Sequence, residues 1–164
     1  MTKIIVLSDS HGYSTYMRNA IEKEIPDMII HLGDGWNDIE ELHKDYEDIP
    51  LEHVIGNCDW VIEVAEKLIT VEGKKILMCH GDKYYVKSGY NNILYAGLEK
   101  GADIVLFGHT HNPLNTTSGK MIVFNPGSIR GNPMLEQKPS YGIIEIDGDS
   151  PEEDNVKAQI KYVD

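Results

Sequence analysis

The stretch KIIVLSDSHG, residues 3–12, joins a short aliphatic run to a polar loop that contains Asp9 and His11. An aliphatic run bounded by polar residues is typical of a strand that is buried on both faces. Two residues that are two apart in an extended segment point the same way, so Asp9 and His11 could share one metal ion. For this motif alone the simpler alternative is favoured, an aspartate that caps the next helix and a surface histidine.

The same pattern, a buried strand followed by a polar residue, recurs four times at Gly33-Asp34, Gly56-Asn57, His80 and Gly108-His109-Thr110-His111. Gly-Asp and Gly-Asn also suit ordinary turns, and a histidine at a strand end is often a packing residue. The His-Thr-His pair is the most specific fragment, because it presents two imidazoles to one side. Sites in open α/β sheets gather at the carboxyl ends of strands, so the common placement of all five segments indicates one site.

The chain between these segments predicts a β-α-β-α-β first half and a second half richer in hairpins, within one domain over residues 1–164. Ser14 is expected to cap the first helix, and Ile25 to lie on its buried side. His31 could orient a ligand or simply pack in its strand, and His43 and His53 are given no role. The predicted elements are strands at 3–7, 28–32, 51–55, 103–107, 140–146 and 156–162, helices at 15–24, 37–46 and 90–100, and hairpins over 60–78 and around 118–119.

Composition restricts the partners of this chain of 164 residues. Its net charge of −12 should repel a long nucleic acid, but bound metal ions would still attract a small phosphorylated substrate. No segment reaches the length of a transmembrane helix, so no membrane partner is expected, and the chain enters a strand directly after Met-Thr-Lys, so no signal peptide is expected. The two cysteines, Cys58 and Cys79, adjoin Asn57 and His80, which favours a reducing, cytoplasmic location without a disulfide. Composition is compatible with both a monomer and a homo-oligomer.

The ordered set of five segments resembles the calcineurin-like metallophosphoesterases, and most of all their small bacterial and archaeal phosphodiesterase branch. The resemblance implies an α/β fold with a central two-sheet β-sandwich flanked by helices, in four layers. It also implies two divalent metal ions, most simply manganese, with iron, zinc or nickel as alternatives that the mixed ligand set suits equally. By analogy, Asp34 bridges both ions, one held also by Asp9, His11 and His111, and the other also by Asn57, His80 and His109.

This ligand set predicts a dinuclear phosphodiesterase for small phosphodiesters or nucleotides, in which a metal-activated water attacks phosphorus in line with the leaving group. Asn57, Asp34 and His109 would form the catalytic centre around that water. The alternatives are a phosphomonoesterase or nuclease of the same chemistry, or a non-catalytic scaffold on the same fold, as in relatives from the retromer complex.

Several positions beside the ligands bear on this chemistry. Many relatives carry a histidine where this chain has Cys58, so the proton donor for the leaving group is in question. Asp59 is a candidate for orienting a ligand or touching the substrate. Arg130, beyond the turn 125–128, is either a phosphate or base contact or a surface arginine. Asp82, where close relatives often have a histidine, is expected to change the rim of the pocket.

Overall fold

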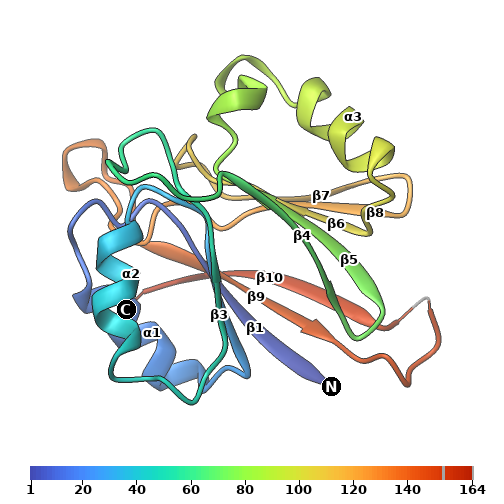
Figure 1. Ribbon diagram of the computed structural model, residues 1–164, viewed down its shortest axis with the longest axis horizontal. Helices are drawn as coiled ribbons and strands as arrows, with labels where there is room; N and C mark the ends of the chain where they lie inside the picture. The colour runs from blue at the N-terminus through green and yellow to red at the C-terminus, as the bar shows by residue number, and fades with distance from the viewer. Residues whose placement is uncertain (153, 164) are drawn as a thin grey trace.

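The computed structural model describes residues 1–152 and 154–163, and in that part of the chain ten strands form two five-stranded sheets accompanied by three α-helices (Figure 1). The first sheet has the strand order β10-β9-β1-β2-β3, with bounds β1 Thr2–Leu7, β2 Met28–His31, β3 Leu51–His53, β9 Ser140–Ile146 and β10 Val156–Tyr162. The second has the order β4-β5-β6-β8-β7, with bounds β4 Glu66–Val71, β5 Lys74–Cys79, β6 Ile104–Leu106, β7 Leu114–Ser118 and β8 Met121–Asn125.

Parallel strands form the centre of both sheets. β1, β2 and β3 run parallel, with Ile4 opposite Met28, and β5, β6 and β8 run parallel in the second sheet. The helices are α1 Thr15–Glu24, α2 Trp36–His43 and α3 Asn91–Glu99, and α1 and α2 connect the first three strands. Short 3-10 helices lie at Asp82–Tyr84, Val86–Ser88 and Pro133–Leu135. No helix among the described residues combines the length and the apolar character needed to cross a bilayer.

The layers explain why the strands read as continuous aliphatic runs. Ile4 and Val6 belong to the core between the two sheets, whereas Ile5 and Leu7 point to the opposite face and pack with α1 and α2. A third core lies where α3 covers the outer face of the second sheet (Figure 1). A strand that is buried on both faces carries apolar side chains at successive positions rather than at alternate ones. The predicted α/β sandwich flanked by helices is therefore confirmed.

Local predictions at element ends were less accurate. Ser14 occupies the position before α1, but its side chain makes no capping hydrogen bond. Ile25 is 78% exposed rather than buried, because the chain turns into a left-handed conformation where α1 ends. The first predicted hairpin strand begins at Glu66, so residues 60–65 form a loop, and α2 ends at His43 rather than near residue 46.

Candidate metal centre

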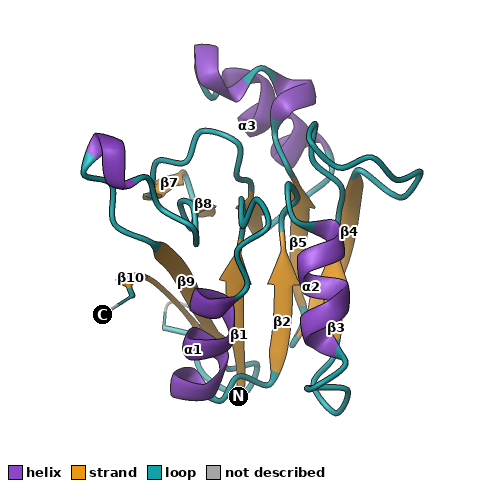
Figure 2. Ribbon diagram, turned by 90° about the vertical axis from the view of Figure 1, so that its left-hand side faces the viewer, coloured by secondary structure: helices purple, strands orange, loops and turns teal. Residues whose placement is uncertain are grey.

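The five predicted segments meet at one end of the molecule. They follow the carboxyl ends of β1, β2, β3, β5 and β6, and the arrowheads of β1 and β2 in Figure 2 point to that end. Because the two sheets lie face to face, the loops from both sheets converge there. The site thus collects side chains that lie far apart in sequence, such as His11 and His111, which are 100 residues apart.

One cluster consists of Asp9, His11 and His111, whose potential ligand atoms lie within 4.8 Å of one another. The Nε2 atom of His111 is 3.2 Å from Oδ1 of Asp9, and that of His11 is 3.6 Å from the same oxygen. The two Nε2 atoms are 3.3 Å apart. This is the group that the resemblance implied for one metal ion.

A second cluster consists of Asp34, His80 and His109, again within 4.8 Å. Nε2 of His80 lies 3.2 Å from Oδ2 of Asp34 and 3.1 Å from Nδ1 of His109. The same Oδ2 is 3.7 Å from Nε2 of His11, so Asp34 lies between the two clusters. Nδ1 of His80 donates to the carbonyl of Leu32 at 2.9 Å, which leaves Nε2 as the atom that faces the cluster.

The backbone is unusual at these positions. Left-handed φ angles occur at five of the candidate ligands, Asp9 (56°), His11 (44°), Asp34 (57°), His109 (69°) and His111 (61°). Residues with a Cβ adopt this region at a cost, and such residues concentrate at functional sites. Gly108 allows the close approach, because a Cβ there would collide with Ser8 and with the carboxylate of Asp9.

A buried carboxylate oxygen shows that the site suits a cation. Asp9 is fully buried, and its Oδ2 accepts hydrogen bonds from the Ser8 hydroxyl at 2.5 Å and the His109 amide at 3.1 Å. Its Oδ1 accepts no hydrogen bond of ordinary geometry from any described residue. An unpaired buried charge is costly. Three imidazole nitrogens surround this oxygen at 3.2 to 3.8 Å, a donor set of nitrogen and oxygen that fits a divalent metal.

The charges of the two clusters are strongly coupled. Burial acts to raise the pKa of Asp9, but His11, His111 and His80 hold it well below its usual range. Burial acts to lower the pKa of His80, but its contact with Asp34 and the charge of Asp9 raise it to about 9. Without metal, a protonated His80 thus supplies positive charge between the carboxylates of Asp9 and Asp34.

Asp59 holds two of the ligand loops together. Its carboxylate accepts hydrogen bonds from the backbone amides of Asp34 (2.8 Å), Gly35 (3.0 Å), Trp36 (3.0 Å) and Gly56 (2.8 Å). These amides belong to the loop after β2, the first turn of α2 and the loop after β3. Asp59 therefore fixes the position of Asp34 from behind, through the backbone rather than through a ligand side chain.

Asn57, Cys58 and Arg130 lie on the open side of the site, and all three are exposed. Nδ2 of Asn57 is 3.6 Å from the Cys58 sulfur, and the Cys58 amide donates to Oδ1 of Asp34 at 2.8 Å. The thiol forms a third cluster with His11 and Asp34, and partial burial and the Asp34 charge raise the pKa of Cys58. Arg130 shares a surface cleft with Cys58. Cys58 and Cys79 are both free thiols.

Two supporting residues had no role in the sequence reasoning, although their turn, residues 125–128, was noted. The side-chain nitrogen Nδ2 of Asn125 donates to the carbonyl of Gly108 at 3.1 Å and to the Thr110 hydroxyl at 3.0 Å. The Ser128 hydroxyl donates to the carbonyl of Asp9 at 2.8 Å. The turn after β8 therefore ties together the loops that follow β1 and β6.

The other histidines lie outside the two clusters. His31 is buried at the end of β2, where Nδ1 accepts from the Gly33 amide at 3.1 Å and Nε2 lies 3.1 Å from the Ser10 hydroxyl, so it shapes the ligand loops from within its strand. His43 donates to the carbonyl of Ile49 at 2.7 Å. His53 stacks on Trp36.

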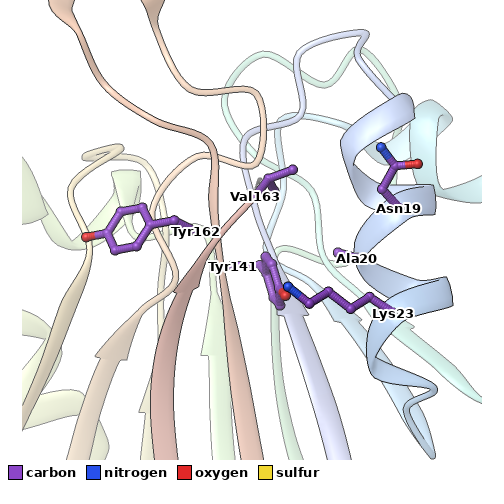
Figure 3. Close-up of a pocket in the computed structure, with 6 residues that line it drawn as sticks. All are labelled: Asn19, Ala20, Lys23, Tyr141, Tyr162 and Val163. Atoms are coloured by element: carbon purple, nitrogen blue, oxygen red, sulfur yellow. The ribbon is translucent and has the colours of Figure 1, made fainter.

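A separate hollow of about 230 Å³ lies between α1 and the ends of β9 and β10 (Figure 3). Lys23 and Tyr141 both point into the space between the helix and the strands. None of the candidate ligands lines it. We therefore place the functional site at the strand ends alone.

Comparison with known proteins shows the family of this chain. The family model of the calcineurin-like phosphoesterase superfamily domain matches residues 2–149. The probable metallophosphoesterase YsnB of Bacillus subtilis is 33% identical over 151 residues, which cover 90% of this chain and 86% of the relative. The phosphodiesterase MJ0936 of Methanocaldococcus jannaschii is 26% identical over 165 residues, covering 88% and 93%.

The fold is shared more widely than the sequence. Vacuolar protein sorting 29 from Cryptosporidium parvum superposes with a TM-score of 0.77 over 98% of both chains, at 16% sequence identity. That likeness concerns the fold alone. The match of the family model to nearly the whole chain, together with the relative at 33% identity, identifies a metal-dependent phosphoesterase that belongs to the calcineurin-like phosphoesterase superfamily.

Proposed function

We propose that this chain is a dinuclear phosphodiesterase that hydrolyses small phosphodiesters or nucleotides. The observation that carries the proposal is the pair of clusters that meet at Asp34, with the unpaired Oδ1 of Asp9 between imidazoles. The phosphodiesterase activity named for the relative from Methanocaldococcus jannaschii supports the choice of a diester. The complete set of seven candidate ligands favours an enzyme over a non-catalytic scaffold.

In this proposal Asp34 would be a ligand of both of two divalent ions, most simply manganese. Asp9, His11 and His111 complete one site, and Asn57, His80 and His109 complete the other in the arrangement that the resemblance implies. When bound, such a pair supplies an activated water and positive charge for the phosphate oxygens. The protein's own part is to fix the ligand geometry and to keep Asp34 and Asp9 ionised.

The open side of the site must receive the phosphate and release the alcohol. Asn57 lies at this side, where its Nδ2 contacts the Cys58 thiol and its side-chain oxygen is the atom that would serve as a metal ligand. Cys58 lines the cleft on this side and carries a proton, but a thiol of raised pKa is a weak acid. We therefore expect a preference for diesters with good leaving groups. A cytoplasmic location and a small substrate complete the proposal.

The test is to measure metal binding and hydrolysis on the same preparation. Calorimetric titration of metal-stripped protein with Mn²⁺ should give two ions per chain, and the loaded protein should hydrolyse bis(p-nitrophenyl) phosphate faster than p-nitrophenyl phosphate. His109→Ala should weaken binding of one ion, whereas His43→Ala, outside the clusters, serves as the matched control. A protein that binds two ions but cleaves neither compound would contradict the proposal, and faster cleavage of the monoester would indicate a phosphomonoesterase.

A further inference from the structure

A cleft of about 440 Å³ opens beside the metal centre. His11 and Asp34 lie on its metal-facing side, and Cys58, Asp59, Trp60 and Arg130 contribute to the other walls. The cleft is therefore continuous with the place where a phosphate would meet the two clusters. Its outer part is large enough for a group attached to that phosphate.

The acidic walls of the cleft are already committed to the protein. The Asp59 carboxylate accepts four backbone amides, and the Asp38 carboxylate accepts the Ser10 hydroxyl at 2.7 Å and the Gly12 amide at 2.8 Å. Arg130, in contrast, forms no hydrogen bond or ion pair with any residue that the structure describes. A free guanidinium at the edge of a metal centre is suited to a phosphate oxygen.

The two tryptophans of the chain differ sharply. Trp36 stacks on His53, with ring centroids 3.6 Å apart and planes 9° apart. Trp60 is 96% exposed, so its indole packs against almost nothing in its own chain. An exposed indole gives up the large gain available from burying an aromatic ring, which marks it as a surface for a ligand.

The base of the loop that carries Trp60 is nevertheless fixed. The neighbouring Asp59 is held by four amides, and its own amide donates to the Gly56 carbonyl at 3.2 Å. At the far end of the loop the Ile55 amide donates to the Val64 carbonyl at 2.9 Å. The indole therefore stands beside the metal centre on an anchored backbone, which lowers the cost of ordering it on a ligand.

Building on the proposed phosphodiesterase function, we propose that the substrate is a phosphodiester whose retained group carries a planar aromatic ring, a nucleobase or an aryl group. Trp60 provides the face on which that ring stacks, and Arg130 contacts the phosphate between the ring and the metals. Stacking of one base on an aromatic side chain corresponds to about 5- to 150-fold in affinity. Trp60 would thus determine specificity without touching the reacting atoms.

The kinetic test uses three diesters that share the p-nitrophenolate leaving group and retain a thymidine, a phenyl or a methyl group. In the Mn²⁺-loaded protein, Trp60→Ala should reduce the preference for the thymidine diester over the methyl diester, measured as a ratio of kcat/KM, by about 5- to 150-fold. Trp60→Phe should keep most of the preference, and Ile62→Ala, an equally exposed residue of the same loop, should leave it as in the wild type. Arg130→Gln should raise KM for all three diesters by about 10-fold, because they share the phosphate.

A binding test separates this inference from the proposed function. Thymidine 5′-phosphate should quench the tryptophan fluorescence of the Mn²⁺-loaded protein, whereas inorganic phosphate should not, and Trp60→Phe should abolish the quenching. If Trp60→Ala lowers kcat/KM, relative to the methyl diester, for both the phenyl and the thymidine diesters, any aromatic ring is sufficient. If it lowers this ratio for the thymidine diester alone, the nucleobase is required. A preference that stays within about twofold in Trp60→Ala, together with unchanged quenching, overturns the inference even if diesters are hydrolysed. Failure to hydrolyse any diester, with the quenching intact, contradicts the proposed function alone.

Discussion

The two sides of the metal centre are built differently. On the Asp9 side the carboxylate is fully buried and its loop is tied down by Ser8 and Ser128. On the side of residues 57–60 the side chains of Asn57, Cys58 and Trp60 are exposed, and the backbone is fixed through the half-buried Asp59. The difference teaches that the fold rigidly positions the candidate ligands on the Asp9 side, whereas the loop of residues 57–60 keeps the other side of the candidate site open. The predictions below test this division of labour.

The largest effect is expected at Asp34, which belongs to the second cluster and also lies beside His11 of the first. Asp34→Asn replaces one bridging oxygen by an amide nitrogen, so diester hydrolysis should fall by at least about 100-fold. Mn²⁺ titration should show fewer than two ions per chain. Full activity in Asp34→Asn would break the assignment of the bridge, and Asp149→Asn, on a distant loop, is the control for loss of a surface carboxylate.

The buried side should couple metal binding to protons. Burial opposes the charge of His80, but the carboxylates raise its pKa to about 9, so metal must displace a proton at pH 7. Metal affinity should therefore rise with pH up to about 9. Calorimetry in two buffers with different ionisation enthalpies should reveal proton release.

The metal-free protein should show the opposite trend. A raised pKa means that the His80 contact stabilises the fold fully below the unfolded value near 6.5 and stops doing so as pH rises through about 9. Denaturant titrations of metal-free protein across this range would measure the decline. Binding heats that do not depend on the buffer would contradict both expectations.

Asp59 tests how the exposed side is held. Asp59→Asn removes a charge and one acceptor from four backbone amides, so the free energy of unfolding should fall by about 2 to 3 kcal/mol. For a chain of this size that lowers Tm by about 5 to 10 °C. Diester hydrolysis should drop by about 10-fold through misplacement of Asp34. Glu47→Gln, which also removes one carboxylate charge, is the control. If Asp59→Asn is as stable and as active as the wild type, the loops after β2 and β3 keep their positions without the Asp59 carboxylate.

The smallest effect is expected at Cys58. Cys58→Ser should change hydrolysis of p-nitrophenyl diesters by less than about threefold, because that leaving group needs no proton. Cys58→His places a better acid at the same position and should speed cleavage of diesters with alkyl leaving groups by about 10-fold. Measuring kcat for diesters with p-nitrophenyl and with alkyl leaving groups checks this. If Cys58→His cleaves the alkyl diesters no faster than the wild type, the side chain at position 58 does not supply the proton.

The sequence was sufficient for features that repeat a strong local pattern. Aliphatic runs at residues 3–7 and 103–107 predicted buried strands, and the polar residues after them lie together because parallel strands end at one edge. The exposed loop 60–65 was predicted as strand, since Val61, Ile62 and Val64 are β-branched residues that favour strands. The hydrogen bonds of Asp59 and Asn125 to the backbone of the ligand loops were not predictable, because backbone donors and acceptors carry no signature in the sequence.

The pairing of His11 with His111 and of Asp9 with the His109 amide spans 100 residues in each case. Such contacts close large loops and join segments that follow strands of different sheets, so they cannot form until the two sheets have docked. A nascent or partly folded chain therefore presents only fragments of the ligand set, each with weak affinity for metal. Tight metal binding would then report that folding is complete, because the full set of candidate ligands and the finished fold arise in the same step.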